Sequence, residues 1–211
     1  LVVGILFFFF FDYSISSFFF KINFQTKSLF SSLTHFGDSL YFFIPTTIIW
    51  ASIKISNSKN KIITCISDIS LFIFFSILLS GFIAQMAKHI IGRPRPNLYN
   101  SSNIKGIDIF SFDSKWHSFP SGHTTTIFAV IFCLFFLFPR IKNLLITLAI
   151  IIASTRVIIG AHFVSDIFGG ILVAYICTIF VRKKLFKKNK LFNFKDDLYI
   201  PKDEVTQIFS N

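Results

Sequence analysis

Residues 155–166 read TRVIIGAHFVSD and join two apolar stretches of the chain, 144–159 and 167–181. With their flanking residues, both stretches have the length and composition of helices that cross a lipid bilayer. The joining segment contains an arginine, a histidine and an aspartate, which are rare in membrane segments unless they have partners or a function. The segment therefore predicts two membrane helices joined by a turn that carries reactive polar groups.

The composition of the whole chain is typical of a membrane protein. Hydrophobic residues make up 53% of the 211, phenylalanine alone occupies 32 positions, and the mean hydropathy is +0.68. A soluble domain of this size could not bury so many large apolar side chains. We predict an all-α integral membrane bundle of about six transmembrane helices within residues 1–190, followed by a polar, loosely ordered tail over 191–211. The six predicted spans are residues 2–20, 40–55, 69–87, 124–138, 144–159 and 167–181.

The net charge of +11 follows the membrane boundaries and does not form a nucleic-acid-binding pattern. Six cations lie between Arg182 and Lys190, directly after the last apolar stretch, as is typical of a cytoplasmic flank. With six spans, one side of the membrane receives eleven cations and the other receives eight. We therefore predict a multi-pass protein of the cytoplasmic (inner) membrane with both termini in the cytoplasm. The joining segment 155–166 and the segment between the third and fourth predicted spans, which contains residues 88–96 and 120–123, would then face outward, toward the periplasm.

Residues 88–96 read KHIIGRPRP and follow another apolar stretch. Pro94 and Pro96 stop the helix and stiffen the turn, so the cations beside them lose little conformational freedom when they bind an anion. The planar guanidinium of Arg95 can contact two phosphate oxygens, and Lys88 adds a point charge. Taken alone, this segment is better explained as a basic helix end followed by a proline turn.

Residues 120–123 read PSGH and begin a further apolar stretch. Ser121 is expected to cap the helix, whose first backbone N–H groups are free to bind an anion. Gly122 lets the backbone approach a phosphate closely, and His123 is placed to protonate a leaving oxygen. An ordinary capped membrane helix with an interfacial histidine explains this segment equally well.

The segment 155–166 is the most specific of the three. His162 and Asp166 are four residues apart, so on a helical start they share a face and can form a hydrogen bond. Such a carboxylate orients the imidazole and leaves its other nitrogen free to attack phosphorus. Arg156 would neutralise charge on the transferring group. A purely structural Arg–Asp or His–Asp pair is the alternative.

Together, the three segments resemble the signature of the type 2 phosphatidic acid phosphatase superfamily, a family of membrane lipid phosphatases. Its first motif is a lysine followed after six residues by Arg-Pro, which Lys88, Arg95 and Pro96 match. Its second motif, Pro-Ser-Gly-His, is matched by residues 120–123. Its third motif is Ser-Arg, five residues, His, three residues and Asp. The chain matches it except for Thr155 in place of serine, which keeps the hydroxyl.

The resemblance implies a chemical role for each matched residue. In the family, the third-motif histidine is the nucleophile that forms a phosphohistidine, and the second-motif histidine is the general acid. These residues correspond to His162 and His123, and Asp166 would orient the nucleophile. The residues expected to hold the phosphoryl oxygens are Lys88, Arg95, Ser121, Gly122 and Arg156. The implied substrate is a membrane lipid phosphate, and undecaprenyl diphosphate, phosphatidylglycerophosphate, phosphatidate and phosphorylated lipid A all fit.

Two other functions are compatible with parts of the sequence. A phosphotransferase would use the same pocket and pass the phosphate to a second lipid or a sugar instead of water. A transporter or structural protein would carry ionisable groups deep within several spans, and Asp12 is the only clear case. Asp108 and Asp113 suggest a metal, but no compact carboxylate or histidine cluster accompanies them in the sequence. We predict neither a metal nor a cofactor, and the sequence does not fix the oligomeric state.

Overall fold

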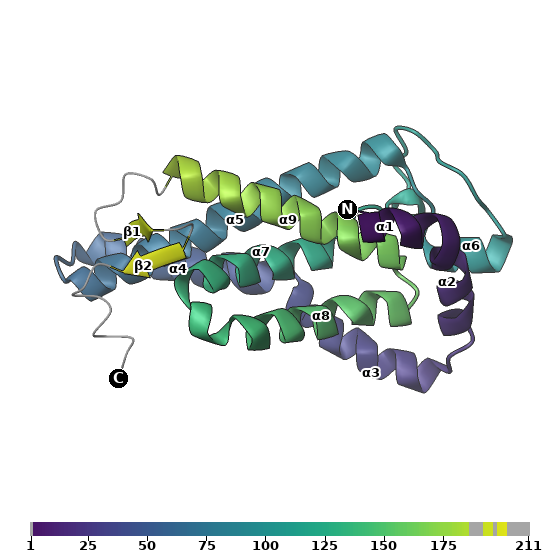
Figure 1. Ribbon diagram of the computed structural model, residues 1–211, viewed down its shortest axis with the longest axis horizontal. Helices are drawn as coiled ribbons and strands as arrows, with labels where there is room; N and C mark the ends of the chain where they lie inside the picture. The colour runs from purple at the N-terminus through teal and green to yellow at the C-terminus, as the bar shows by residue number, and fades with distance from the viewer. Residues whose placement is uncertain (1, 186–191, 196–197, 202–211) are drawn as a thin grey trace.

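The computed structural model describes residues 2–185, 192–195 and 198–201. Long helices lie side by side and form an elongated bundle (Figure 1). Its elements are α4 (Leu40–Ser56), α5 (Lys61–Ile91), α7 (Gly122–Leu137), α8 (Lys142–Ile158) and α9 (Val164–Leu185). The centre of the bundle is α7, which packs against α5, α8 and α9. Five consecutive α7 residues, from Ile127 to Ile131, are buried, as expected for a helix surrounded by others.

Within the described residues, three helical segments are long and apolar enough to cross a membrane: Phe24–Ser56, Ile62–Ile91 and Val164–Lys184. A fourth apolar helix, Gly122–Phe135, is shorter. These segments confirm the predicted helical membrane bundle, whereas the exact number of spans stays a prediction. The span predicted over 69–87 belongs to a longer helix, α5, which begins eight residues earlier. Asn60 caps that helix by accepting a hydrogen bond from the backbone N–H of Ile62 at 2.9 Å.

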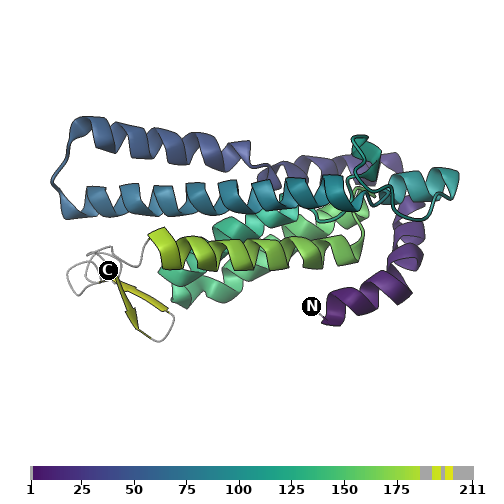
Figure 2. The same cartoon turned by 90° about the horizontal axis from the view of Figure 1, so that it is seen from above.

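The N-terminal segment, predicted as one span over 2–20, is bent. It consists of α1 (Val2–Leu6), the π-helical turn η1 (Phe7–Phe11) and α2 (Asp12–Phe20). Figure 2 shows α2 lying across the end of the bundle. A π-helical turn adds a residue to one turn and commonly marks a bend.

Residues 21–39, for which no element was predicted, contain α3 (Phe24–Thr34) and the 3₁₀ turn η2 (His35–Gly37). Asn23 caps α3 by accepting a hydrogen bond from the N–H of Thr26 at 2.9 Å. Serine, threonine, glutamine and lysine interrupt the apolar pattern of this helix, so hydropathy did not reveal it. The element nevertheless contributes to the site, because α3 packs against α8.

The three motif segments lie at one end of the bundle, as predicted (Figure 1). That end holds the C-terminal ends of α5 and α8 and the N-terminal ends of α7 and α9. The short helix α6 (Pro96–Ser102) and the 3₁₀ turn η3 (Ser114–Trp116) lie in the loop between the first two motifs. The opposite end holds the connection from α4 to α5 and the turn η4 (Pro139–Ile141) between α7 and α8. Which side of the membrane each end faces stays a prediction.

The tail predicted over 191–211 falls largely outside the described residues. Within it, β1 (Phe192–Lys195) and β2 (Leu198–Pro201) pair antiparallel, with Phe194 opposite Tyr199. This small sheet corrects the expectation that the whole tail is loosely ordered. Aromatic residues, which favour strands, occur in both segments, and the second also contains an isoleucine.

Candidate active site

The first motif leaves α5 through Gly92, whose left-handed backbone (φ +56°) ends the helix. A Cβ at this position would lie 1.6 Å from the carbonyl oxygen of Asp108, so only glycine fits. The chain then pairs with the segment before the second motif. The N–H of Arg95 donates to the carbonyl of Lys115 at 2.9 Å, and that of Ser118 donates to the carbonyl of Arg93 at 3.0 Å. This pairing fixes the turn that the two prolines were expected to stiffen.

The second motif forms the N-terminal end of α7. Ser121 is the N-cap, as predicted, and its Oγ accepts hydrogen bonds from the N–H of Thr124 at 3.4 Å and from its hydroxyl at 2.9 Å. Lys88 of the first motif reaches this helix end, because its Nζ lies 3.5 Å from the point that a Cβ on Gly122 would occupy. The first two motifs therefore meet, with the ammonium group beside the first turn of α7.

His162 lies in the turn before α9 and is 2% exposed. Its Nδ1 is 3.6 Å from Oδ2 of Asp166, and it donates instead to the carbonyl of Ser118 at 2.7 Å. The expected pair is therefore close, but the hydrogen bond that orients the ring goes to a backbone carbonyl. Among the described residues, Nε2 of His162 has no hydrogen-bond partner.

Burial lowers the pKa of His162 to about 3, and the Asp166 carboxylate only partly opposes this shift. The charges of Lys88 and Arg156 lower it further. The imidazole is therefore neutral near pH 7, as a nitrogen nucleophile must be.

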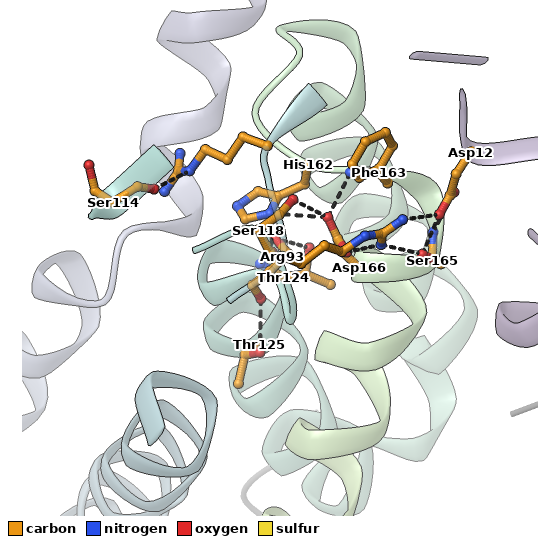
Figure 3. Close-up of polar contacts among 12 residues, drawn as sticks. Asp12, Arg93, Ser114, Ser118, Thr124, Thr125, His162, Phe163, Ser165 and Asp166 are labelled. Carbon is orange, nitrogen blue, oxygen red and sulfur yellow. Dashed lines mark hydrogen bonds and ion pairs between the residues drawn. The ribbon is translucent and has the colours of Figure 1, made fainter. Parts of the chain in front are cut away.

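Asp166 is fully buried, and each of its oxygens is hydrogen-bonded (Figure 3). Oδ2 accepts from the N–H of Phe163 at 2.8 Å and from the hydroxyl of Ser118 at 2.5 Å, while Oδ1 accepts from Arg93. The bond to Phe163 caps the N-terminal end of α9. Ser118 was missed by the sequence analysis, although it touches both His162 and Asp166. It lies outside the recognised motifs, and nothing in its local pattern marks it.

Arg93 belongs to the first motif segment, but the sequence analysis gave it no role. Its side chain is 5% exposed and contacts three partners (Figure 3). Nη2 lies 2.8 Å from Oδ2 of Asp12, and Nη1 bonds to Oδ1 of Asp166 and, at 2.7 Å, to the hydroxyl of Ser165. Burial acts to lower the pKa of Arg93, but the two carboxylates outweigh it and raise the pKa. The sequence did indicate a partner for Asp12, because a carboxylate in an apolar stretch needs one.

The remaining motif cations contrast with Arg93. Nε of Arg95 donates to the carbonyl of Ser114 at 3.0 Å, and Nη1 of Arg156 donates to the hydroxyl of Thr34 at 3.0 Å. In the described part of the chain, Lys88, Arg95 and Arg156 form no ion pair with a carboxylate. The charges of both arginines act unfavourably on the ammonium group of Lys88. Asp166 attracts Lys88 and Arg95 only from beyond ion-pair distance, so the three converging cations favour the binding of an anion.

A cavity of about 480 Å³ opens beside these cations. Lys88, Gly122 and His123 line it, together with Asp38 from the turn before α4. The geometry thus brings the predicted acid, His123, to one cavity with Lys88 and Gly122, whereas Arg95 and Ser121 are not part of its lining. His162 is not part of its lining, because it is almost fully buried beside Ser118.

Two histidines without a predicted role, His89 in the last turn of α5 and His117 in the loop, have structural contacts, as do Asp108 and Asp113. The carbonyl of Ser111 accepts from Nδ1 of His89 at 3.1 Å and from Nε2 of His117 at 2.9 Å. Asp113 caps η3 by accepting from the N–H of Lys115 at 2.9 Å, and the N–H of Asp108 donates to the carbonyl of Gly92 at 2.8 Å. These bonds hold the loop between the first two motifs against the end of α5.

A protein-family model matches the part of the chain that contains this arrangement of motifs. The model of the PAP2 superfamily matches residues 70–190, more than half of the chain, and this stretch contains all three motifs. The chain belongs to the PAP2 superfamily. The match confirms the resemblance drawn from the three motifs.

Two curated proteins that are similar in sequence to this PAP2 chain are lipid A 1-phosphatases. That of Rhizobium johnstonii is 34% identical over 152 residues, which is 69% of this chain and 62% of the relative. That of Rhizobium etli is 33% identical over 152 residues, which is 69% of this chain and 65% of the relative. The chain therefore spans less than two thirds of the length of the curated relatives that it matches.

Solved structures share the fold. The crystal structure of Aquifex aeolicus LpxE covers 77% of this chain and 88% of its own, with a TM-score of 0.55 and 22% identity. The first transmembrane PAP2 type phosphatidylglycerolphosphate phosphatase from Bacillus subtilis covers 85% of this chain and 86% of its own, with a TM-score of 0.60 and 21% identity. The bundle is therefore a PAP2 membrane fold.

Proposed function

We propose that this protein is a membrane lipid phosphatase that removes a phosphate monoester from a lipid of the lipid A type through a phosphohistidine. The observation that carries the proposal is the free Nε2 of a neutral, oriented His162 at the bundle end where three unpaired cations converge. The names of the two Rhizobium relatives favour lipid A over the other lipid phosphates as the substrate class. The whole reaction is a proposal for this chain.

In the proposed reaction, Nε2 of His162 attacks phosphorus, and a P–N bond forms as the bond to the lipid oxygen breaks. That oxygen takes a proton from His123, whose protonated form is favoured by the anionic phosphate beside it. Lys88, Arg95 and Arg156 neutralise the phosphoryl oxygens, and N–H groups at the start of α7 donate to them. Water, deprotonated by His123, then displaces the imidazole and yields inorganic phosphate.

The proposed location is the inner membrane, with the site facing outward and the C-terminal tail in the cytoplasm. The six cations that follow the last apolar stretch in the sequence, between Arg182 and Lys190, support this orientation. A lipid phosphate in the outer leaflet would then meet the site at the membrane surface.

The test is phosphate release by the purified full chain in detergent with chelator present. Lipid A, undecaprenyl diphosphate, phosphatidylglycerophosphate and phosphatidate are supplied in parallel, and lipid A is expected to be the best substrate. His162→Ala should lower kcat at least about 10³-fold, because the nucleophile is lost. His89→Ala, which removes an imidazole outside the proposed chemistry, should keep kcat within a few-fold of wild type.

Labelled lipid phosphate should also leave an acid-labile, base-stable phosphate on the wild-type chain and none on His162→Ala. Full activity of His162→Ala would overturn the mechanism. Transfer of the label to a second lipid instead of water would replace the phosphatase with a phosphotransferase.

A further inference from the structure

A buried carboxylate outside the PAP2 match reaches the proposed site. Asp12, the first residue of α2, is 1% exposed, and its Oδ2 lies 2.8 Å from Nη2 of Arg93. The same guanidinium bonds through Nη1 to Oδ1 of Asp166. One arginine therefore bridges two carboxylates, of which one lies beside His162 and the other belongs to the N-terminal segment (Figure 3).

Asp12 also holds the first turn of α9. Its Oδ1 accepts from the N–H of Ser165 at 3.1 Å, and its Oδ2 accepts from the hydroxyl of the same residue. Ser165 directly precedes Asp166, so these bonds fix the backbone from which the Asp166 side chain projects. Phe8 and Phe163 enclose the Arg93 guanidinium, with ring centroids 4.7 and 4.2 Å from its central carbon.

The charges of this network bear on the nucleophile. Within this network, Asp12 and Asp166 together outweigh Arg93 by one negative charge, and Asp166 is the carboxylate that lies beside the imidazole. When His162 takes up the phosphoryl group its ring becomes positively charged, and a buried negative charge stabilises that state with little screening. Without Asp12 the network would be neutral, and Arg93 would form its ion pair with Asp166 alone.

We propose that Asp12 is a positioning residue for phosphoryl transfer. It holds Arg93 and the start of α9 so that Asp166 keeps both its place and its negative charge beside His162. This inference rests on the proposed function and adds to it a residue from outside the three motifs.

The test is Asp12→Asn, which keeps the shape of the side chain and removes its charge. We expect kcat to fall about 10- to 100-fold, as when a residue that orients a reactive group is lost, while KM stays within twofold. Asp12→Glu, which restores the charge, should have a kcat about tenfold higher than that of Asp12→Asn. The matched control is Ser16→Ala on the same helix, which removes the acceptor of the Asn100 amide and leaves the network intact. Its kcat should equal that of wild type.

The proposal is overturned if Asp12→Asn keeps kcat within twofold, or if it and Ser16→Ala lose activity and melting temperature in parallel. If Asp12→Asn does not fold, Ser165→Ala takes its place, because it removes a hydroxyl that bonds to both Asp12 and Arg93. Its kcat should fall three- to tenfold, and a wild-type value would again overturn the proposal.

His162→Ala, assayed alongside, separates the proposed function from the proposed role of Asp12. If it is active, the proposed function fails, whereas if it is inactive and Asp12→Asn is fully active, only this inference fails.

Discussion

Arg93 and Arg95 are two residues apart in one segment, yet their surroundings are opposite. Arg93 is 5% exposed and contacts two carboxylates. Arg95 is half-buried, and its Nε donates to the backbone carbonyl of Ser114. Within the described residues, Arg95 shares with Lys88 and Arg156 the lack of a carboxylate partner.

The difference separates a structural role from a ligand-binding one. The protein itself supplies the counter-ions of Arg93, so this network can stabilise the fold and orient Asp166. Among the described residues, Lys88, Arg95 and Arg156 have no carboxylate at ion-pair distance, and Asp166 attracts Lys88 and Arg95 only from farther away. An anion from outside would relieve the repulsion that remains. Binding sites commonly reduce stability in this way. Substitutions in the two clusters should therefore have opposite effects on stability and activity.

The largest effect on stability is expected for Arg93→Gln. It leaves Asp12 and Asp166 buried without their counter-ion, which typically costs about 3–5 kcal/mol. Thermal unfolding in detergent, followed by tryptophan fluorescence, measures the loss. Lys21→Gln, which removes an exposed cation, should change stability by less than about 0.5 kcal/mol. An Arg93→Gln chain as stable as wild type would remove the distinction between the clusters.

Lys88→Gln should show the opposite pattern. Its kcat/KM should fall about 10²- to 10³-fold, because a cation that stabilises the transferring phosphoryl group is lost. Its melting temperature should stay level or rise, because the burial of the charge and its repulsion by Arg95 and Arg156 outweigh the attraction of Asp166 that is lost with it. Phosphate release and thermal unfolding on the same preparation test both halves. A marked loss of stability would mean that Lys88 belongs with the structural cluster.

A smaller effect concerns His162, which lies between the clusters. Its pKa is lowered to about 3 in the folded chain, so between that value and its ordinary pKa of about 6.5 the unfolded chain binds more protons. The stability that His162 contributes is present above about pH 6.5 and is lost as the pH falls toward 3. From pH 7 to pH 5 the loss is about 2 kcal/mol.

His162→Asn, which does not titrate, should lose correspondingly less stability over the same interval. Melting temperatures of the two chains at pH 7 and pH 5 give the difference. Equal losses in both chains would show that His162 is not held neutral by the fold.

The sequence was sufficient for the helical membrane bundle and for the arrangement of the motifs at one end. Apolar stretches mark membrane helices, and polar motifs between alternate stretches must return to the same end. The sequence did not reveal the partners of Arg93, because Asp12 lies 81 residues away and no local pattern links the two residues. A buried carboxylate and an arginine without a role were the two available signals.

The orientation of His162 shows a second limit. A spacing of four predicts contact on a helix, but His162 precedes α9, and its Nδ1 bonds to the carbonyl of Ser118. A backbone acceptor carries no residue-type signal, so it is visible only in the fold. The helix α3 was missed for a related reason, since its polar residues hide an element that brings Thr34 to Arg156.

The alternating directions of the four helices at the site have a consequence for the lipid phosphate. α5 and α8 bring the partially negative poles of their dipoles, next to Lys88 and Arg156 in their last turns. α7 and α9 bring positive poles, and at α9 the protein supplies the anion itself, as Asp166. In the proposed reaction the substrate phosphate occupies at α7 the electrostatic position that Asp166 occupies at α9. If the proposed reaction is correct, the bundle places its own carboxylate at the start of one helix and the substrate phosphate at the start of another.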